Sequence, residues 1–240
     1  MNAVRILPLL VLVASAGSPP LWVGHFAEAG TPPAPWRTLR VPGKTATAYR
    51  VATVAGRIAL EAKFKSSMSL MVRPITVDLR ERPIMCWRWY VDGPVQWADM
   101  SRKSGDDYAA RIYVGFDMPD SALSAMERLK LNVARNLYGK SLPDAAVVYV
   151  WDNVHARGTA RKSSYTNRMQ LVVSEAGASQ ARTWVSERAN VAADFAKAFG
   201  NKPGKPVQIA VASDGDNTRS SGRAAFADIH FVGADSQCAL

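Results

Sequence analysis

The sequence predicts a mainly β fold, an antiparallel β-sandwich of the jelly-roll kind with one or two short helices. Short runs of β-branched and aromatic residues follow one another along the chain, with turn residues between them. Within several runs apolar and polar residues alternate, which is typical of strands that bury one face. Many such strands in succession indicate a sandwich or a barrel.

The expected elements belong to a single domain over residues 36–240. Strands are predicted at residues 48–54, 58–64, 76–79, 84–91, 108–116, 147–153, 169–175, 184–186, 207–213 and 224–232. Residues 121–138 and 191–199 show the three- and four-residue apolar spacing of amphipathic helices. Pro119 and Asp120 give a start signal for the first helix, and Gly200 suits the end of the second.

The N-terminus has the layout of a secretory signal peptide. A short start that contains Arg5 precedes an apolar run, and the small residues Ala14 to Ala16 follow it. The run is shorter than the ~20 residues of a spanning helix. We therefore expect a signal peptide over residues 1–16, a proline-rich leader over 17–35, no transmembrane segment after cleavage, and a periplasmic or secreted protein.

The formal net charge of +10 favours anionic partners. The basic residues are dispersed, and no nucleic-acid-binding motif occurs, so nucleic acid is not an expected partner. The two cysteines, Cys86 and Cys238, would meet an oxidising compartment in which a disulfide can form. One lies in a predicted strand and the other near the C-terminus, which argues against pairing and leaves it open. The oligomeric state is also open.

Strand alternation separates a core face from a polar face. Trp87 and Trp89 share one face of their strand, and Arg88 and Tyr90 share the other. The predicted core contains Trp87, Trp89, Ile112, Val114, Phe116, Leu171 and Val173. The predicted polar face contains Arg88, Tyr90, Arg111, Tyr113, Tyr149, Trp151, Arg168 and Gln170.

Such a face suits a saccharide or another polar ligand, because aromatic rings stack on apolar ligand faces and arginine donates several hydrogen bonds. A solvated outer face, or a face buried under the helix at 121–138, is the alternative. If the face binds a ligand, Arg111→Ala and Trp151→Ala should lose binding and cost less stability than Trp89→Ala.

The turn from Asp214 to Thr218 has acidic and amide residues at alternate positions, which can bind calcium through oxygen atoms. Asp214 and Asp216 are the candidate ligands, with Asp228 or Asp106 as additions from elsewhere. The same residues commonly form a simple hairpin turn. Calcium is thus a candidate cofactor, and no cofactor is certain.

A glycan hydrolase would need paired carboxylates, which Asp106 or Asp107 could form with Asp214 or Asp216. An ion pair between Asp107 and Arg111 is the simpler role. We assign no catalytic residue, since the sequence has no nucleophile elbow, zinc-type histidine spacing or nucleotide-binding loop.

Several separated motifs occur in a characteristic order: Trp87-Arg88-Trp89, Gly105-Asp106-Asp107, Ala109-Ala110-Arg111-Ile112-Tyr113-Val114, Tyr149-Val150-Trp151, Asn190-Val191 with Asp194, Phe199-Gly200, Asp214-Gly215-Asp216-Asn217-Thr218 and Ala227-Asp228-Ile229-His230-Phe231. Their order resembles domain of unknown function family 3047, a family of exported bacterial proteins. The resemblance implies export and brings no activity or substrate. The last hairpin is also similar to that of jelly-roll carbohydrate-binding modules.

These observations favour a non-catalytic binding module that holds a saccharide or anionic envelope component. A glycan hydrolase and a structural envelope protein are the alternatives.

Overall fold

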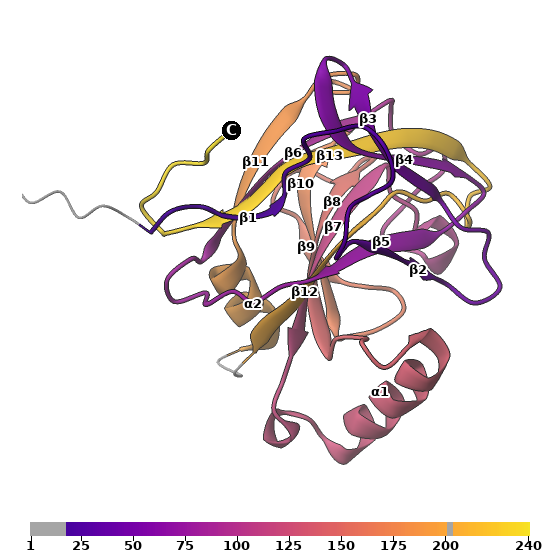
Figure 1. Ribbon diagram of the computed structural model, residues 1–240. Helices are drawn as coiled ribbons and strands as arrows, with labels where there is room; N and C mark the ends of the chain where they lie inside the picture. The colour runs from indigo at the N-terminus through magenta and orange to yellow at the C-terminus, as the bar shows by residue number, and fades with distance from the viewer. Residues whose placement is uncertain (1–17, 201–203) are drawn as a thin grey trace, which may run out of the picture.

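Two β-sheets pack face to face in the computed structural model, which describes residues 18–200 and 204–240 (Figure 1). The predicted signal peptide lies outside the described residues. The first sheet, sheet A, is antiparallel throughout. Its order is β11 (Val185–Asn190), β6 (Ile84–Val91), β13 (Ser221–Val232), β4 (Arg57–Lys65) and β3 (Ala48–Val54), and β1 (Leu21–Gly24) also pairs with β13.

The second sheet, sheet B, contains one parallel pair. Its order is β2 (Arg37–Arg40), β5 (Ser69–Pro74), β12 (Lys205–Ala212), β7 (Ala110–Asp117), β8 (Ala145–Asp152), β10 (Met169–Ala176) and β9 (Ala160–Lys162). Only β8 and β10 run parallel among its paired strands within the described residues. The predicted mainly β sandwich is confirmed, with this one departure from antiparallel pairing.

Most expected strands are present, with end points shifted by a few residues. Residues 76–79 form no strand, and β1, β2, β5 and β9 lie outside the expected set. The position of β1 also corrects the domain boundary. This strand falls within the predicted leader, yet it pairs with β13 and buries Val23, so the sandwich begins before Trp36.

The core lies between the sheets, where alternate residues of both point inward. Trp87 of sheet A packs against Tyr149 of sheet B with ring centroids 5.2 Å apart, and Trp89 packs against Trp151 at 5.7 Å. The predicted inward positions of Trp87, Trp89, Ile112, Val114 and Phe116 are confirmed.

A second apolar cluster covers the outer face of sheet B. Leu171 and Val173 belong to it, together with Val148 and Val150 of the neighbouring strand. The prediction that Leu171 and Val173 lie between the sheets is therefore wrong. Leu171 is in register with Val148, so the two residues project to the same side of the sheet.

Two α-helices flank the sandwich. Helix α2 (Val191–Phe199) begins after Asn190, whose side chain accepts a hydrogen bond from the Ala193 N–H, and it packs Phe195 on Phe116 with ring centroids 4.2 Å apart. Short 3₁₀ turns occupy Lys103–Gly105 and Asp120–Ala122. No helix in the described ranges has the length and apolar character needed to cross a membrane.

Helix α1 (Ala125–Tyr138) begins at a capping box formed by Ser124 and Glu127. It extends away from the two sheets (Figure 1), and Leu131 is its only buried residue. The alternative in which this helix covers the predicted polar face is therefore wrong. Its apolar residues Met126, Leu129, Val133 and Leu137 are all more than half exposed.

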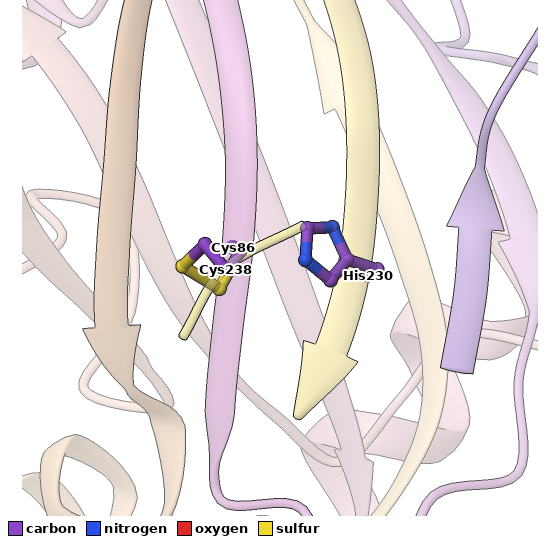
Figure 2. A group of neighbouring side chains, drawn as sticks. All are labelled: Cys86, His230 and Cys238. Atoms are coloured by element: carbon purple, nitrogen blue, oxygen red, sulfur yellow. A yellow bond between two sulfur atoms is a disulfide. The ribbon is translucent and has the colours of Figure 1, made fainter. Parts of the chain in front are cut away.

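The C-terminal tail is attached to sheet A. A disulfide joins Cys86 of β6 to Cys238, and Figure 2 shows His230 of β13 beside it. Nδ1 of His230 donates to the Asp228 carbonyl at 2.6 Å, and Nε2 accepts from the Ala239 N–H at 3.0 Å. The argument from sequence position against pairing is therefore wrong, because the chain after β13 turns back along the sheet.

Candidate functional site

The residues of the predicted polar face lie in separate places. Arg88 and Tyr90 are on the outer face of sheet A, where Arg88 Nη1 donates to Asp228 at 2.8 Å. Tyr90 is buried and packs against Trp184 at 5.8 Å between ring centroids. Arg111 and Tyr113 are on the outer face of sheet B, across the sandwich from this pair.

Tyr149 and Trp151 lie in the core rather than on a polar surface. In the antiparallel register Tyr149 is opposite Ile112 and Trp151 is opposite Ala110. Opposite residues project to the same side of a sheet, so Tyr149 and Trp151 point into the core as Ile112 and Ala110 do. The Tyr149 hydroxyl donates to Asp194 at 2.9 Å, and Trp151 Nε1 donates to the Gly177 carbonyl at 3.0 Å. Their polar atoms are thus satisfied internally.

The last two predicted residues also have internal contacts. Arg168 Nη1 donates to Glu127 of α1 at 2.7 Å, and its Nε donates to the Asp144 carbonyl. Gln170 is buried, and its amide donates to the Leu171 carbonyl at 3.3 Å. The prediction of one continuous binding face is therefore wrong, because strands β8 and β10 project their side chains to the opposite sides from those expected.

Asp228 does not lie with the other two predicted metal ligands. Its carboxylate lies 3.2 Å from His25 Nδ1, 3.0 Å from Arg57 Nη1 and 2.8 Å from Arg88 Nη1. The predicted metal set of Asp214, Asp216 and Asp228 is thus wrong in its third member. A carboxylate oxygen of Asp107, rather than of Asp228, lies within 4.8 Å of oxygens of Asp214 and Asp216.

Four aspartates converge around Arg111, and we call them the carboxylate cluster: Asp106, Asp107, Asp214 and Asp216. The first two precede β7, and the last two follow β12, which pairs with β7. Arg111 Nη2 lies 2.5 Å from Asp214, and its Nη1 lies 3.6 Å from Asp106. The neighbouring positions of the two strand ends bring these distant parts of the sequence together.

The turn after β12 is fixed to the entrance of β7. The backbone N–H groups of Asn217 and Thr218 donate to the two carboxylate oxygens of Asp107 at 3.2 and 2.6 Å. The Asp214 N–H donates to the Tyr108 carbonyl at 3.2 Å. Asp216 is paired with Lys44 Nζ at 2.6 Å. The turn therefore presents its acidic side chains inward in one defined arrangement.

The cluster is buried and electrostatically crowded. Burial raises the pKa of Asp214 well above its ordinary value, although the Arg111 guanidinium opposes that change. Burial also raises the pKa of Asp106. Arg111 lies over the rings of Tyr108 at 4.9 Å and Tyr113 at 5.6 Å, contacts that stabilise its charge. Oδ1 of Asp214 is buried and has no hydrogen-bond partner within the described residues.

Two exposed aromatic residues belong to segments that border the cluster or the end of its turn. Tyr165 is 55 % exposed, and its pKa is raised by burial and by the negative charges of Asp106 and Asp216. Trp97 is 74 % exposed. It follows Gln96, whose carbonyl accepts from the Ser220 hydroxyl at 3.1 Å, at the end of the acidic turn. Tyr165 and the half-exposed Lys44 therefore border the cluster, and the segment that carries Trp97 is joined to the end of the acidic turn.

Sequence reasoning identified the aspartates and Arg111, but it missed Lys44, Trp97 and Tyr165. A tryptophan three residues after the turn-forming pair Gly93-Pro94 was a usable sequence signal for a loop position of Trp97. No local pattern distinguishes Lys44 or Tyr165, because both reach the cluster through the tertiary fold.

A second group of side chains with metal-binding atoms is formed by Cys86, Cys238 and His230 (Figure 2). Its sulfur atoms form the disulfide, and both imidazole nitrogens are engaged in hydrogen bonds with the backbone. Burial lowers the pKa of His230, which favours the neutral ring. This group acts as a structural attachment of the tail.

A family model described as protein of unknown function (DUF3047) matches residues 34–230 of the chain. The chain belongs to this family. The resemblance to family 3047 stated from the sequence is confirmed. Membership in the DUF3047 family assigns no activity, so the site has to be interpreted from its own chemistry.

Other comparisons add little. No curated protein matches the chain. Among solved structures, a crystal structure of an ENZbleach xylanase mutant is 12% identical, with 94% of this chain and 92% of that chain covered and a TM-score of 0.45. A second mutant of the same xylanase is 12% identical, with 94% and 91% covered and a TM-score of 0.44. At this level the likeness does not extend to activity.

Proposed function

We propose that this chain is an exported bacterial protein that binds a saccharide without catalysis, at the rim of the carboxylate cluster. The observation that supports this most is the position of Trp97 and Tyr165. Both rings are more than half exposed, Tyr165 lies in the field of Asp106 and Asp216, and the segment that carries Trp97 is bonded to the end of the acidic turn. Rings of this kind stack on the apolar faces of sugars, while carboxylates and ammonium groups hydrogen bond to the hydroxyls.

The salt bridge between Asp216 and Lys44 provides the polar half of the site. The Lys44 side chain is 41% exposed, whereas the Asp216 side chain is only 8% exposed. A ligand hydroxyl can therefore reach Lys44 directly. It can bind Asp216 only by displacing the Lys44 ammonium group from that carboxylate. Three buried residues hold the aspartates in place and therefore act as positioning residues: Arg111, Tyr113 and Tyr108.

Export is the second part of the proposal. It is supported by the layout of residues 1–16 and by the Cys86–Cys238 disulfide, because disulfides persist in oxidising compartments.

A glycan hydrolase is the second candidate, since carboxylate oxygens of Asp107, Asp214 and Asp216 lie within 4.8 Å of one another. Retaining glycosidases need carboxyl groups at a similar separation, ~5 Å. Both oxygens of Asp107 accept backbone hydrogen bonds, and Asp214 is fully buried against Arg111. These constraints keep both carboxylates from a glycosidic bond and favour binding over hydrolysis.

The test is a binding screen of the mature protein against glycans and peptidoglycan fragments, followed by calorimetry. Trp97→Ala with Tyr165→Ala should weaken binding by on the order of a hundredfold, since aromatic side chains are frequent hot spots. Tyr138→Ala, which removes an aromatic ring that is 41 % exposed on α1, is the matched control and should bind as the wild type does.

Loss of glycan binding in Tyr138→Ala, or full affinity in the Trp97→Ala and Tyr165→Ala double variant, contradicts a saccharide site beside the carboxylate cluster. Release of sugar from a fluorogenic glycoside by the wild type, abolished in Asp216→Asn, would support the hydrolase instead.

A further inference from the structure

The carboxylate cluster contains more negative charge than its protein partners neutralise. Within the described residues, the salt bridges of its four aspartates involve only two basic side chains, Arg111 and Lys44. This excess occurs in a chain whose formal net charge is +10. Uncompensated buried carboxylates are costly, and a bound cation is one way in which proteins compensate them.

The geometry of the cluster fits a small cation. One carboxylate oxygen from each of Asp107, Asp214 and Asp216 lies within 4.8 Å of the others. Two oxygens bound to the same Ca²⁺ at 2.3–2.6 Å cannot be more than about 5 Å apart. The three oxygens are therefore close enough to share one ion, and carboxylate oxygens are the ligands that calcium prefers.

An independent observation concerns the hydrogen bonds of Asp214. Its side chain is 0% exposed, and one of its oxygens, Oδ2, is paired with Arg111. The other oxygen, Oδ1, is buried and has no hydrogen-bond partner among the described residues. A buried carboxylate oxygen without a partner is rare in folded proteins, and a missing ion is one of its recognised explanations.

We propose that Asp107, Asp214 and Asp216 bind a calcium ion, with the remaining coordination positions filled by water or by a ligand. This site does not depend on saccharide binding. Arg111 stays on Oδ2 of Asp214 and orients that carboxylate. Lys44, whose side chain is flexible and 41% exposed, leaves Asp216 when the ion enters.

Titration calorimetry with CaCl₂ on metal-free protein tests the site. The wild type should bind one ion, and Asp216→Asn should bind it more weakly by on the order of tenfold or more, because one charged ligand is lost. Lys44→Gln should bind the ion more tightly than the wild type, because it removes a competing positive charge. Asp92→Asn, which changes an aspartate paired with Arg223 elsewhere, should leave the affinity unchanged.

The thermal midpoint of the wild type should also rise with CaCl₂ and fall on addition of EDTA. No heat of binding at millimolar CaCl₂, or equal affinities for the wild type and Asp216→Asn, overturns the proposal. Calcium binding without glycan binding would contradict only the proposed function.

Helix α1 supports a second inference, which rests on its exposed face. Met126, Leu129, Val133 and Leu137 follow one another at spacings of three and four residues, and their exposed fractions are 59%, 58%, 53% and 61%. This spacing places them on one side of the helix. The opposite side holds Leu131, the only buried residue of the helix. An apolar stripe directed to solvent is typical of an interaction surface.

The charges near the stripe indicate its partner. Over residues 124–140 the basic residues are Arg128, Lys130, Arg135 and Lys140, and the single acidic residue is Glu127. Glu127 is already bonded to Arg168 and to the Ser124 N–H. Lys130 and Lys140 are exposed beside the stripe. We infer that α1 lies in the interface of a membrane with anionic headgroups, where apolar insertion and positive charge act together.

Co-sedimentation with lipid vesicles tests this inference. The wild type should bind vesicles that contain phosphatidylglycerol, bind less as salt increases, and bind phosphatidylcholine vesicles weakly. Leu129→Ser with Val133→Ser should abolish binding, whereas Val154→Ser, at a site that is 76% exposed elsewhere, should not. Absence of binding to the anionic vesicles overturns the inference. Concentration-dependent dimerisation of the wild type that the double variant abolishes also overturns it, because the stripe would then join two copies of the chain.

Discussion

At the scale of single residues, burial decides which aromatic and charged side chains are structural. Trp151 and Trp89 are both fully buried, and their rings contact each other between the sheets. Arg111 is also buried, with its charge paired to Asp214. The expectation that Trp151 and Arg111 stabilise the fold less than Trp89 does therefore has no basis in their environments.

We expect Trp151→Ala to lower the free energy of unfolding by about 3–5 kcal/mol, the same range as Trp89→Ala, because each opens a cavity in the core. Trp97→Ala, at an exposed position, should change it by less than about 0.5 kcal/mol. Urea denaturation followed by circular dichroism measures all three. A Trp151→Ala protein as stable as the wild type would refute the core position.

Glu187 provides a test of pH dependence. It is buried in β11 and bonded to Arg157 at 2.8 Å, yet burial raises its pKa to about 7. Between pH ~4.5, the unfolded pKa of this residue, and pH about 7, its folded pKa, the folded state binds more protons than the unfolded state. The contribution of Glu187 to the free energy of unfolding therefore decreases as the pH rises through this range. Glu187→Gln removes that dependence.

The stability of Glu187→Gln relative to the wild type should therefore increase as the pH is raised from 5 to 8. Other titrating groups are the same in both proteins, so the difference between their unfolding free energies isolates Glu187. Guanidinium denaturation at both pH values gives this difference. A constant difference would show that Arg157 keeps the carboxylate ionised throughout.

At the scale of secondary structure elements, β8 explains why the binding face was mispredicted. The run Val147-Val148-Tyr149-Val150-Trp151 is apolar at every position, so alternation does not identify its inward face. Pairing with β7 decides the question by placing Tyr149 opposite Ile112. By contrast, β6 alternates between tryptophan and polar residues, and its inward face is predicted correctly.

The attachment of the C-terminal tail to β6 should contribute to the stability of the fold. The disulfide closes a loop with a sequence separation of 152 residues, and His230 also receives a hydrogen bond from the tail. Cys86→Ser with Cys238→Ser should lower the free energy of unfolding by about 2–5 kcal/mol. Thermal denaturation with and without reductant measures the effect. The wild type should become less stable in reductant, and a similar loss in the double variant would show that the reductant acts elsewhere.

At the scale of the whole molecule, the sandwich brings the ends of β7 and β12 together and so forms the carboxylate cluster. The same architecture places the cluster and α1 outside the inter-sheet core.

Export is a property of the whole chain. If residues 1–16 form a signal peptide, protein recovered from the periplasm of its host should begin at Gly17. N-terminal sequencing measures this. Protein that retains Met1 and stays in the cytoplasm would contradict export and would leave Cys86 and Cys238 in a reducing environment.

The sequence by itself determined the fold class, most strands, both helices and the family, because these depend on local periodicity and on the order of short motifs. It also identified Asp214 and Asp216 as candidate ligands. Tertiary structure decided the rest. Three features depend on strand register and on contacts between distant segments: the position of Asp107 rather than Asp228 beside Asp214 and Asp216, the core positions of Tyr149 and Trp151, and the outward stripe of α1. Local sequence patterns do not specify such contacts, because pairing between strands determines which side of a sheet a residue occupies.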